Sequence, residues 1–260
     1  MIAHGPATVS EVVAGAGSVG NVTVFALWSA ARSRSTAFFR SMLERSDVLA
    51  LHEPLEGLVY IGPLDAAGRT FESAAGLLDW LVDEAEGDVF LKETMAPRVM
   101  ELVRAHARFL TEARHAFLIR RPQEIAASFL ALEGDLRIHE TGVEALYEMH
   151  GAVRDAGGQA VVIDSDDLVR RPEATMEAYC AAVGLAFDPD SLSWEAGIQP
   201  AWERTARWHE DASASTGFHA PGEADRHGLA SHPDVIRFAE RHSVFYDRLR
   251  ELRLRVDQLP

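Results

Sequence analysis

Short runs of apolar residues recur along the chain and alternate with longer segments in which apolar residues repeat every three or four positions. The short runs lack polar alternation, which is typical of strands buried on both faces of a parallel sheet. They predict five strands, at residues 22–28, 48–52, 89–92, 116–119 and 160–163. The longer segments predict helices at residues 35–45, 74–86, 98–111, 123–132, 143–156 and 173–183.

This alternation of strands and helices predicts an α/β fold. The expected architecture is an open, mainly parallel central sheet flanked by helices, the three-layer sandwich of P-loop-type proteins. Residues 188–226 are rich in Trp, His, Ser, Gly and Pro, so we expect an irregular C-terminal lid there, followed by a closing helix at residues 233–252. Residues 1–20 are small and Gly-rich, and we interpret them as a flexible N-terminal arm. Residues 21–260 then form a single domain.

Composition narrows the classes of partner. The net charge of -15 disfavours non-specific binding to nucleic acid or to anionic membranes. The chain contains no apolar run long enough to cross a membrane and no basic region typical of a signal peptide.

The single cysteine, Cys180, excludes an internal disulfide and favours a reducing, cytoplasmic location. The eleven histidines form no metal-binding motif, so we expect no metal. Nothing in the sequence indicates the oligomeric state.

Two segments of the sequence are candidate phosphate-binding loops. Gly15, Gly17 and Gly20 match the spacing G-x-G-x-x-G, but a predicted strand follows them where that fingerprint requires a helix, so we assign them to the arm. The second loop connects the strand at residues 22–28 to a helix. Its backbone N–H groups and the helix dipole favour an anion there. The loop carries the residues Arg32, Ser33, Arg34, Ser35 and Thr36.

The arginines of this loop add charge and bidentate geometry for an anion. A capped helix with two solvated arginines is the alternative. The Walker motif G-x-x-x-x-G-K-[ST] is absent, which disfavours an ATP- or GTP-dependent kinase. The loop resembles the 5′-phosphosulfate loop of the sulfotransferases that use PAPS (3′-phosphoadenosine-5′-phosphosulfate). It departs from that pattern at Ala31, where the family has proline, at Arg34, where it has glycine, and at Ala37, where an aromatic residue often stacks on adenine.

A second motif strengthens the resemblance. A predicted strand ends at Arg120, Pro122 can start the next helix, and Ser128 follows eight residues after the arginine. Arg120 and Ser128 can therefore converge on one phosphate, although a plain strand–proline–helix junction is the alternative. The motif is similar to the 3′-phosphate site of the same family, which implies PAPS as co-substrate and its desulfated form, PAP, as product. The resemblance also implies that part of the lid wraps the nucleotide, at Ser215, Thr216 and Gly217.

The only lysine of the chain, Lys92, ends an apolar run, where a charge is costly without a partner. The family carries a lysine at the end of this strand, which implies a positive charge near the bridging oxygen of the donor. Animal-type members have a catalytic histidine two residues later, but this chain has Thr94. The candidate bases are Glu53, if burial raises its pKa, and His52, whose ordinary pKa suits the role. Each of these could instead be a polar strand-end residue that fixes the turn at Pro54.

The resemblance therefore implies an enzyme that transfers a sulfuryl group from PAPS to a hydroxyl or phenol of a small-molecule acceptor. The products would be PAP and a sulfate ester. Two alternatives stay open: a protein with this fold that binds a nucleotide but performs different chemistry, and another P-loop-like phosphotransferase. The sequence does not identify the acceptor.

Overall fold

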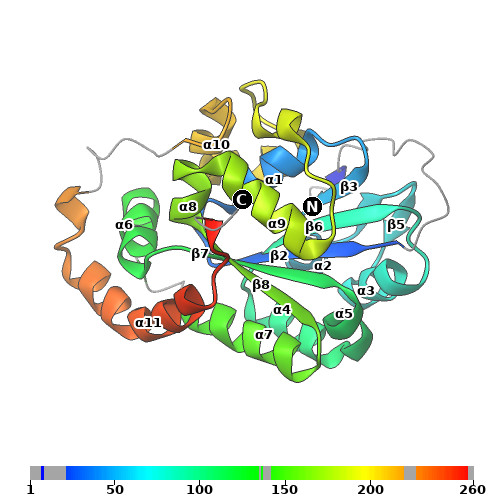
Figure 1. Ribbon diagram of the computed structural model, residues 1–260, viewed down its shortest axis with the longest axis horizontal. Coiled ribbons are helices and arrows are strands. Elements are labelled where there is room, and N and C mark those ends of the chain that lie inside the picture. The colour runs from blue at the N-terminus through cyan, green and yellow to red at the C-terminus, as the bar shows by residue number, and fades with distance from the viewer. Residues whose placement is uncertain (1–6, 9–21, 135, 137–141, 220–226, 257–260) are drawn as a thin grey trace, which may run out of the picture.

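The computed structural model describes residues 7–8, 22–134, 136, 142–219 and 227–256. Five parallel strands form the central sheet in the order β3-β6-β2-β7-β8 (Figure 1). The strands are β2 (Val24–Ser29), β3 (Val48–His52), β6 (Asp88–Thr94), β7 (Arg114–Ile119) and β8 (Gln159–Asp164). The predicted fold class, an open parallel sheet flanked by helices, is confirmed.

Strand β2 shows why the apolar runs lack alternation. Val24, Ala26 and Trp28 pack into the hydrophobic cluster on one face of the sheet. Phe25 and Leu27 pack into the cluster on the other face. A central strand that is covered on both faces needs apolar side chains at every position, because burial removes each of them from water.

Helices cover both faces of the sheet, which gives three layers (Figure 1). One face carries α1 (Ser35–Leu43), α8 (Ser165–Arg170) and α9 (Pro172–Val183). The other face carries α3 (Ala74–Asp83), α4 (Pro97–Ala105), α5 (Ala107–Glu112), α7 (Val143–Asp155) and α11 (Pro233–Glu251). Helix α6 (Pro122–Glu133) packs against α11 at one end of the sheet, and α2 (Pro54–Tyr60) follows β3.

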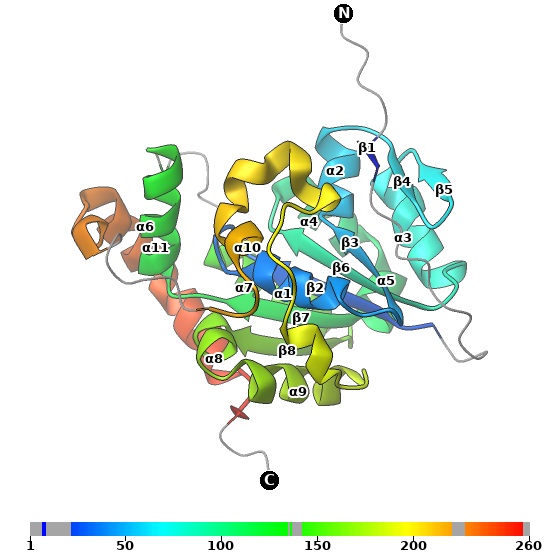
Figure 2. The ribbon, with the colours of Figure 1, turned by 90° about the horizontal axis from the view of Figure 1, so that it is seen from above.

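A second, smaller sheet lies beside α3 (Figure 2). It contains β1 (Ala7–Thr8), β4 (Leu64–Ala66) and β5 (Arg69–Phe71), with β1 parallel to β4 and β5 antiparallel to it. Of the N-terminal arm proposed from the sequence, only Ala7–Thr8 belong to the described residues. The glycines of the G-x-G-x-x-G segment lie outside them.

One predicted helix is wrong in detail. The segment at residues 98–111 is not one helix but two, α4 and α5, which meet at His106. The His106 ring accepts a hydrogen bond from the Phe109 N–H (3.1 Å) and so caps the second helix. Val103 and Phe109, which lie on either side of the break, are both fully buried. In one continuous helix, residues six positions apart would lie on different faces.

The lid segment packs closely against the domain. Within its described part, residues 188–219, it forms η1 (Pro189–Leu192), η2 (Pro200–Trp208) and α10 (Glu210–Ala214), and it lies over α1 (Figure 2). Trp194 and Trp202 are buried in the same cluster as the side chains of α1. A further short turn, η4 (His227–Leu229), precedes α11.

Candidate active site

The carboxyl ends of the five parallel strands meet at one edge of the sheet, where an open α/β sheet binds ligands. A cavity of about 600 Å³ opens at this edge. Strands β2, β6 and β7 and helix α2 each contribute residues at or just beyond their ends, and the lid closes the opposite side. Of the residues singled out from the sequence, the following line the cavity: Arg32, Ser33, Arg34, Ser35, Thr36, Glu53, Lys92, Arg120, Ser128, Ser215 and Gly217.

The loop between β2 and α1 has an unusual backbone. Arg32 and Arg34 adopt φ angles of 61° and 68°. This left-handed region favours glycine and costs other residues roughly 1–2 kcal/mol each. Arg34 occupies the position at which the resemblance leads us to expect glycine. Its guanidinium offsets part of that cost, because Nη1 donates to the carbonyl oxygen of Ser165 (3.1 Å) and to Oδ1 of Asp166 (3.0 Å).

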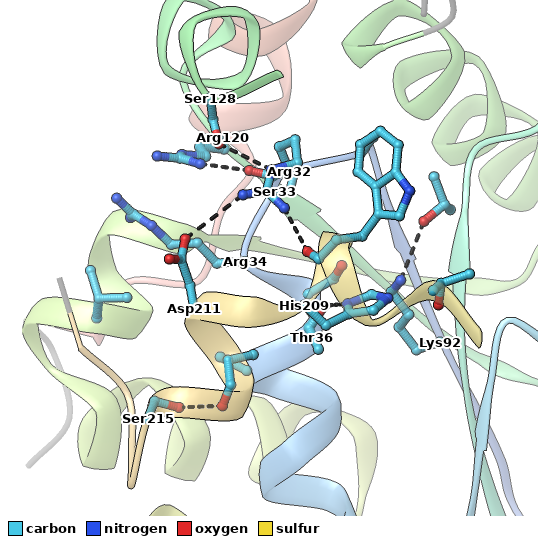
Figure 3. Close-up of a pocket in the computed structure, with 18 of the residues that line it drawn as sticks. Arg32, Ser33, Arg34, Thr36, Lys92, Arg120, Ser128, His209, Asp211 and Ser215 are labelled. Atoms are coloured by element: carbon cyan, nitrogen blue, oxygen red, sulfur yellow. Dashed lines mark hydrogen bonds and ion pairs between the residues drawn. The ribbon is translucent and has the colours of Figure 1, made fainter. Parts of the chain in front are cut away.

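Arg32 joins the two predicted phosphate motifs (Figure 3). Its Nε donates to the hydroxyl of Ser128 on α6 at 3.0 Å. Its own carbonyl oxygen accepts a hydrogen bond from Nη1 of Arg120, at the end of β7, at 2.6 Å. The loop at the end of β2 and the junction at the end of β7 therefore form one continuous surface of donors.

Acidic side chains hold these arginines in place. Arg34 lies 3.0 Å from Asp166, Arg120 lies 3.0 Å from Glu124, and Arg32 lies 3.7 Å from Asp211 of the lid. Arg32 also donates to the carbonyl oxygen of Trp208, at 2.6 Å (Figure 3). A strongly acidic protein can thus keep a cluster of cations at one edge of its sheet, because the acids that neutralise them are placed around the cavity.

Two buried polar atoms of the loop have no hydrogen-bond partner among the described residues, Nε of Arg34 and the hydroxyl oxygen of Ser33. The Ser33 hydroxyl is buried and lines the cavity. A buried polar group of this kind is uncommon, and it is often satisfied by a ligand or water. Together with the adjacent backbone N–H groups at the start of α1, it is suited to an oxyanion.

Lys92 lies at the end of β6, next to His52 of β3 in the sheet, and only 2% of it is exposed. Its Nζ forms an ion pair with Glu53 and lies 3.3 Å from the Thr94 hydroxyl, which itself donates to Glu53 Oε1 at 2.5 Å. Burial raises the pKa of the Glu53 carboxyl, but the Lys92 ammonium, His52 and the hydrogen bonds from Lys92 and Thr94 together outweigh burial and hold that pKa well below its usual range. The upward shift expected from burial alone is therefore not found.

His52 does not reach the cavity. Its ring is buried against the rings of Phe39 (5.0 Å), Trp202 (5.5 Å) and His209 (5.1 Å). Burial, aided by the positive charge of Lys92, lowers the pKa of His52 to about 3, so the ring is neutral. It does not appear among the residues that line the cavity.

The three lid residues singled out from the sequence are placed differently. The Ser215 hydroxyl donates to the carbonyl oxygen of Ala212 (2.8 Å), and Gly217 pairs with Ser193 in an isolated bridge. Both line the cavity. Thr216 does not line it; its carbonyl oxygen accepts from the Trp194 N–H at 3.2 Å.

His209 and Glu56 are among the cavity residues that were not singled out from the sequence. His209, in the lid, contacts the Thr36 hydroxyl through Nδ1 at 2.9 Å, and burial lowers its pKa to about 4. Glu56, in the first turn of α2, also lines the cavity, and burial beside Glu53 raises its pKa to about 7. Neither lies in a motif, and α2 itself was not predicted, so the sequence carried no signal for them beyond their residue types.

Two features are absent from the part of the chain that the structure describes. No group of three or more His, Cys, Asp or Glu side chains is arranged to hold a metal ion. No helix is long and apolar enough to cross a membrane.

Comparison with known proteins gives a consistent family. Residues 82–248 match the family described as Sulfotransferase domain. A curated protein of Arabidopsis thaliana, named Branched-chain-amino-acid aminotransferase-like protein 2, is 30% identical over 223 residues, which are 80% of this chain and 38% of that protein. The chain spans about two fifths of the length of the curated relatives it matches.

Two solved structures share the fold. The sulfotransferase domain from the curacin biosynthetic pathway aligns with a TM-score of 0.50 and 13% identity, covering 86% of this chain and 98% of that one. The sulfotransferase domain from the Synechococcus PCC 7002 olefin synthase also gives a TM-score of 0.50, with 17% identity, 90% of this chain and 98% of that one. At these identities the likeness concerns the fold alone.

Proposed function

The chain belongs to the sulfotransferase domain family, and from this premise we propose that it transfers a sulfuryl group from PAPS to a hydroxyl group of a small molecule. PAP and a sulfate ester would be the products. The proposal names both the donor and the type of acceptor, which the family alone leaves open.

One observation carries the proposed donor: the two arginine-containing junctions open into the same cavity and are joined through Arg32. PAPS has two anionic ends, the 5′-phosphosulfate and the 3′-phosphate. The loop from Arg32 to Thr36 suits the first end, because its N–H groups, the unpartnered Ser33 hydroxyl and the helix dipole favour an oxyanion. Arg120 and Ser128 suit the 3′-phosphate.

Bound PAPS would replace contacts that the lid now makes. Arg32 would exchange the Trp208 carbonyl oxygen and the Asp211 carboxylate for phosphate oxygens. Such an exchange is favourable when the new hydrogen bonds join two fully charged groups with bidentate geometry. The lid would then settle around the nucleotide, with Ser215, Gly217 and the neighbouring Thr216 beside it.

Lys92 suits the developing charge of the reaction. In sulfuryl transfer, as in phosphoryl transfer, the protein mainly positions the reactants and neutralises charge. When the bond between sulfur and the bridging oxygen breaks, negative charge gathers on that oxygen. A buried ammonium at the end of β6 can stabilise this charge more than it stabilises the bound substrate, which is what accelerates the reaction.

Part of the cavity wall is apolar. Trp208 lines it and packs against Phe129 at 5.4 Å. A small hollow that shares Ala31 and Thr94 with the main cavity is lined largely by apolar residues. These surroundings favour an alcohol or a phenol with an apolar part. The aminotransferase-like name of the curated relatives is not carried over, because those proteins are much longer than this chain.

Ligand binding tests the donor. By isothermal titration calorimetry, PAP should bind more tightly than AMP or ATP, because only PAP carries both a 5′- and a 3′-phosphate. Turnover is then measured as PAP released from PAPS in the presence of a panel of alcohols and phenols. Equal affinity for PAP and AMP would refute the assignment of Arg120 and Ser128 to the 3′-phosphate. A preference for ATP would favour a phosphotransferase. PAP binding with no turnover would favour a nucleotide-binding protein with different chemistry.

A further inference from the structure

Three carboxyl groups surround the only lysine of the chain. Glu53 lies between β3 and α2, Glu56 lies in the first turn of α2, and Glu93 follows Lys92 on β6. Their charges act on one another and on Lys92, so the four groups form one electrostatic cluster. One ammonium can neutralise only one carboxylate. The other two carboxyl groups therefore need other partners or a raised pKa.

Glu93 has a structural role. It is fully buried and does not line the cavity, and its carboxyl accepts from the N–H groups of Leu55 (2.5 Å) and Glu56 (3.4 Å) at the start of α2. Burial raises the pKa of Glu93 well above its usual range. It fixes the beginning of α2 and therefore the position of the Glu56 backbone.

Glu53 is occupied by donors. One of its oxygens accepts from both Lys92 and Thr94, and the other lies 3.8 Å from Nδ1 of His52. A carboxylate whose pKa is held low by a neighbouring ammonium is a weak base. Its contacts suit a different task, which is to hold the buried Lys92 ammonium in the wall of the cavity.

The two imidazoles that interact with this cluster, His52 and His209, are no better placed. His52 does not line the cavity, and Nδ1 of His209 is engaged with the Thr36 hydroxyl. Burial lowers the pKa of both rings, to about 3 and about 4, which makes each a weak proton acceptor. Of the three carboxyl groups around Lys92, this leaves Glu56, which is half-buried, lines the cavity and makes no hydrogen bond or ion pair through its side chain among the described residues.

We propose that Glu56 is the base that accepts the proton of the acceptor hydroxyl, with Glu53 as the residue that positions Lys92; this rests on the proposed sulfuryl transfer. The acceptor oxygen forms a bond to sulfur while its proton passes to the Glu56 carboxylate. The bond between sulfur and the bridging oxygen breaks, and PAP leaves with that electron pair beside Lys92. Proton release from Glu56 to water then restores the carboxylate.

The surroundings of Glu56 suit this role. Burial and the Glu53 carboxylate raise the pKa of Glu56 to about 7, and Lys92 acts in the opposite direction. Helices α3 and α4 and strand β4 also pack against α2, but the main causes of the shift are burial, Glu53 and Lys92, and not the charged groups of these elements. A base whose pKa lies near the working pH combines a usable ionised fraction with sufficient proton affinity.

The test compares three variants: Glu56→Gln, Glu53→Gln and, as matched control, Glu101→Gln at an exposed position of α4. Release of PAP from PAPS is followed with water alone and with the acceptor panel, from about pH 5 to about pH 9. Wild-type kcat should fall as the pH drops below about 7, because protonated Glu56 cannot accept a proton. Glu56→Gln should lower kcat by ~10²–10⁴-fold and abolish this fall of kcat at low pH, the acid limb of the pH profile. Glu53→Gln should also lower kcat but keep the acid limb.

Two measurements other than turnover separate a base from a structural residue. The affinity for PAP should be unchanged in Glu56→Gln, and an infrared titration of the protein with PAP bound should lose one carboxyl signal that titrates near neutral pH. Added formate should restore part of the turnover of Glu56→Ala, since it supplies the missing carboxylate.

The outcomes are distinguishable. An active wild type whose acid limb survives in Glu56→Gln overturns the role of Glu56 and leaves the proposed function intact. Loss of the limb in Glu53→Gln instead assigns the base to Glu53. A wild type that neither binds PAP nor consumes PAPS overturns the proposed function and, with it, this role.

Discussion

Replacing Lys92 by methionine should destabilise the protein in a pH-dependent way. Methionine fills much of the space of the lysine stem, so the main loss is the ammonium that pairs with Glu53 in a buried site. Removing one partner of a buried ion pair typically costs about 3–5 kcal/mol, because the other charge stays buried and unpaired. In a domain of this size each kcal/mol lowers Tm by roughly 2–4 °C.

The sign of the pH dependence follows from Glu53. In the wild type its pKa is held below the value of the unfolded chain, so the pair contributes stability at neutral pH that is lost as the pH falls through the lowered pKa. Without Lys92, burial is the largest remaining cause and the Thr94 hydrogen bond opposes it only in part, so we expect the pKa of Glu53 in the folded state to rise above that of the unfolded chain. The cost of the substitution is then full above this raised pKa and shrinks by about 1.4 kcal/mol for each pH unit below it.

Urea denaturation of Lys92→Met and wild type at about pH 8 and about pH 5 measures this difference. The double variant Lys92→Met, Glu53→Gln is the control, since it removes both charges and should recover much of the lost stability at the higher pH. A destabilisation that is equal at both pH values and unchanged by Glu53→Gln would refute the reasoning. It would mean that packing around the lysine stem, and not the ion pair, determines the cost.

Three further substitutions test the site. Lys92→Arg keeps the charge but replaces a compact ammonium by a planar group, so we expect most of the turnover to be lost while calorimetry shows PAP affinity within a few-fold of wild type. Arg120→Ala should weaken PAP by about 1.5–3 kcal/mol and AMP much less in the same assay, with the exposed Arg104→Ala as control. His52→Ala should lower Tm through lost packing against Phe39 and Trp202 but spare the turnover of the folded fraction.

Each of these expectations has a clear opposite. Near-normal turnover of Lys92→Arg would show that any cation serves at this point. Equal losses for PAP and AMP in Arg120→Ala would place that arginine away from the 3′-phosphate. A large fall of turnover in His52→Ala with unchanged Tm would return the ring to the list of candidate bases.

The sheet and its flanking helices were predictable because both depend on local pattern. The five buried strands are uninterrupted apolar runs, and helices such as α6 and α9 begin at a proline and end at a glycine. The break at His106 was not predictable, since the apolar period continues through it and the cap depends on the orientation of one ring. The seven-residue helix α2 and the three-residue strands β4 and β5 are too short to leave a period.

The residues of the candidate site were predictable only where they belong to a motif or, as with the single lysine, depart from the composition of the chain. Arg32, Arg120 and Lys92 stood out by their position at strand ends, and the structure brings them to one cavity. The roles assigned to them stay predictions. No motif in the sequence singles out Glu56 or His209. Their pKa shifts arise from burial and from contacts between segments far apart in the chain, which composition does not report.

The parallel order of the central sheet has a consequence for how the chain reaches this structure. Parallel neighbours cannot be joined by a tight hairpin. Val24 of β2 pairs with Val89, Phe25 pairs with Arg114, and even the nearest partners, such as Val48 and Asp88, are separated by at least one helix. Loop closure must therefore precede every strand pairing of this sheet, which slows folding compared with proteins rich in local contacts. During synthesis the apolar strand β2 leaves the ribosome well before β6 and β7, and its two edges stay open until those partners arrive.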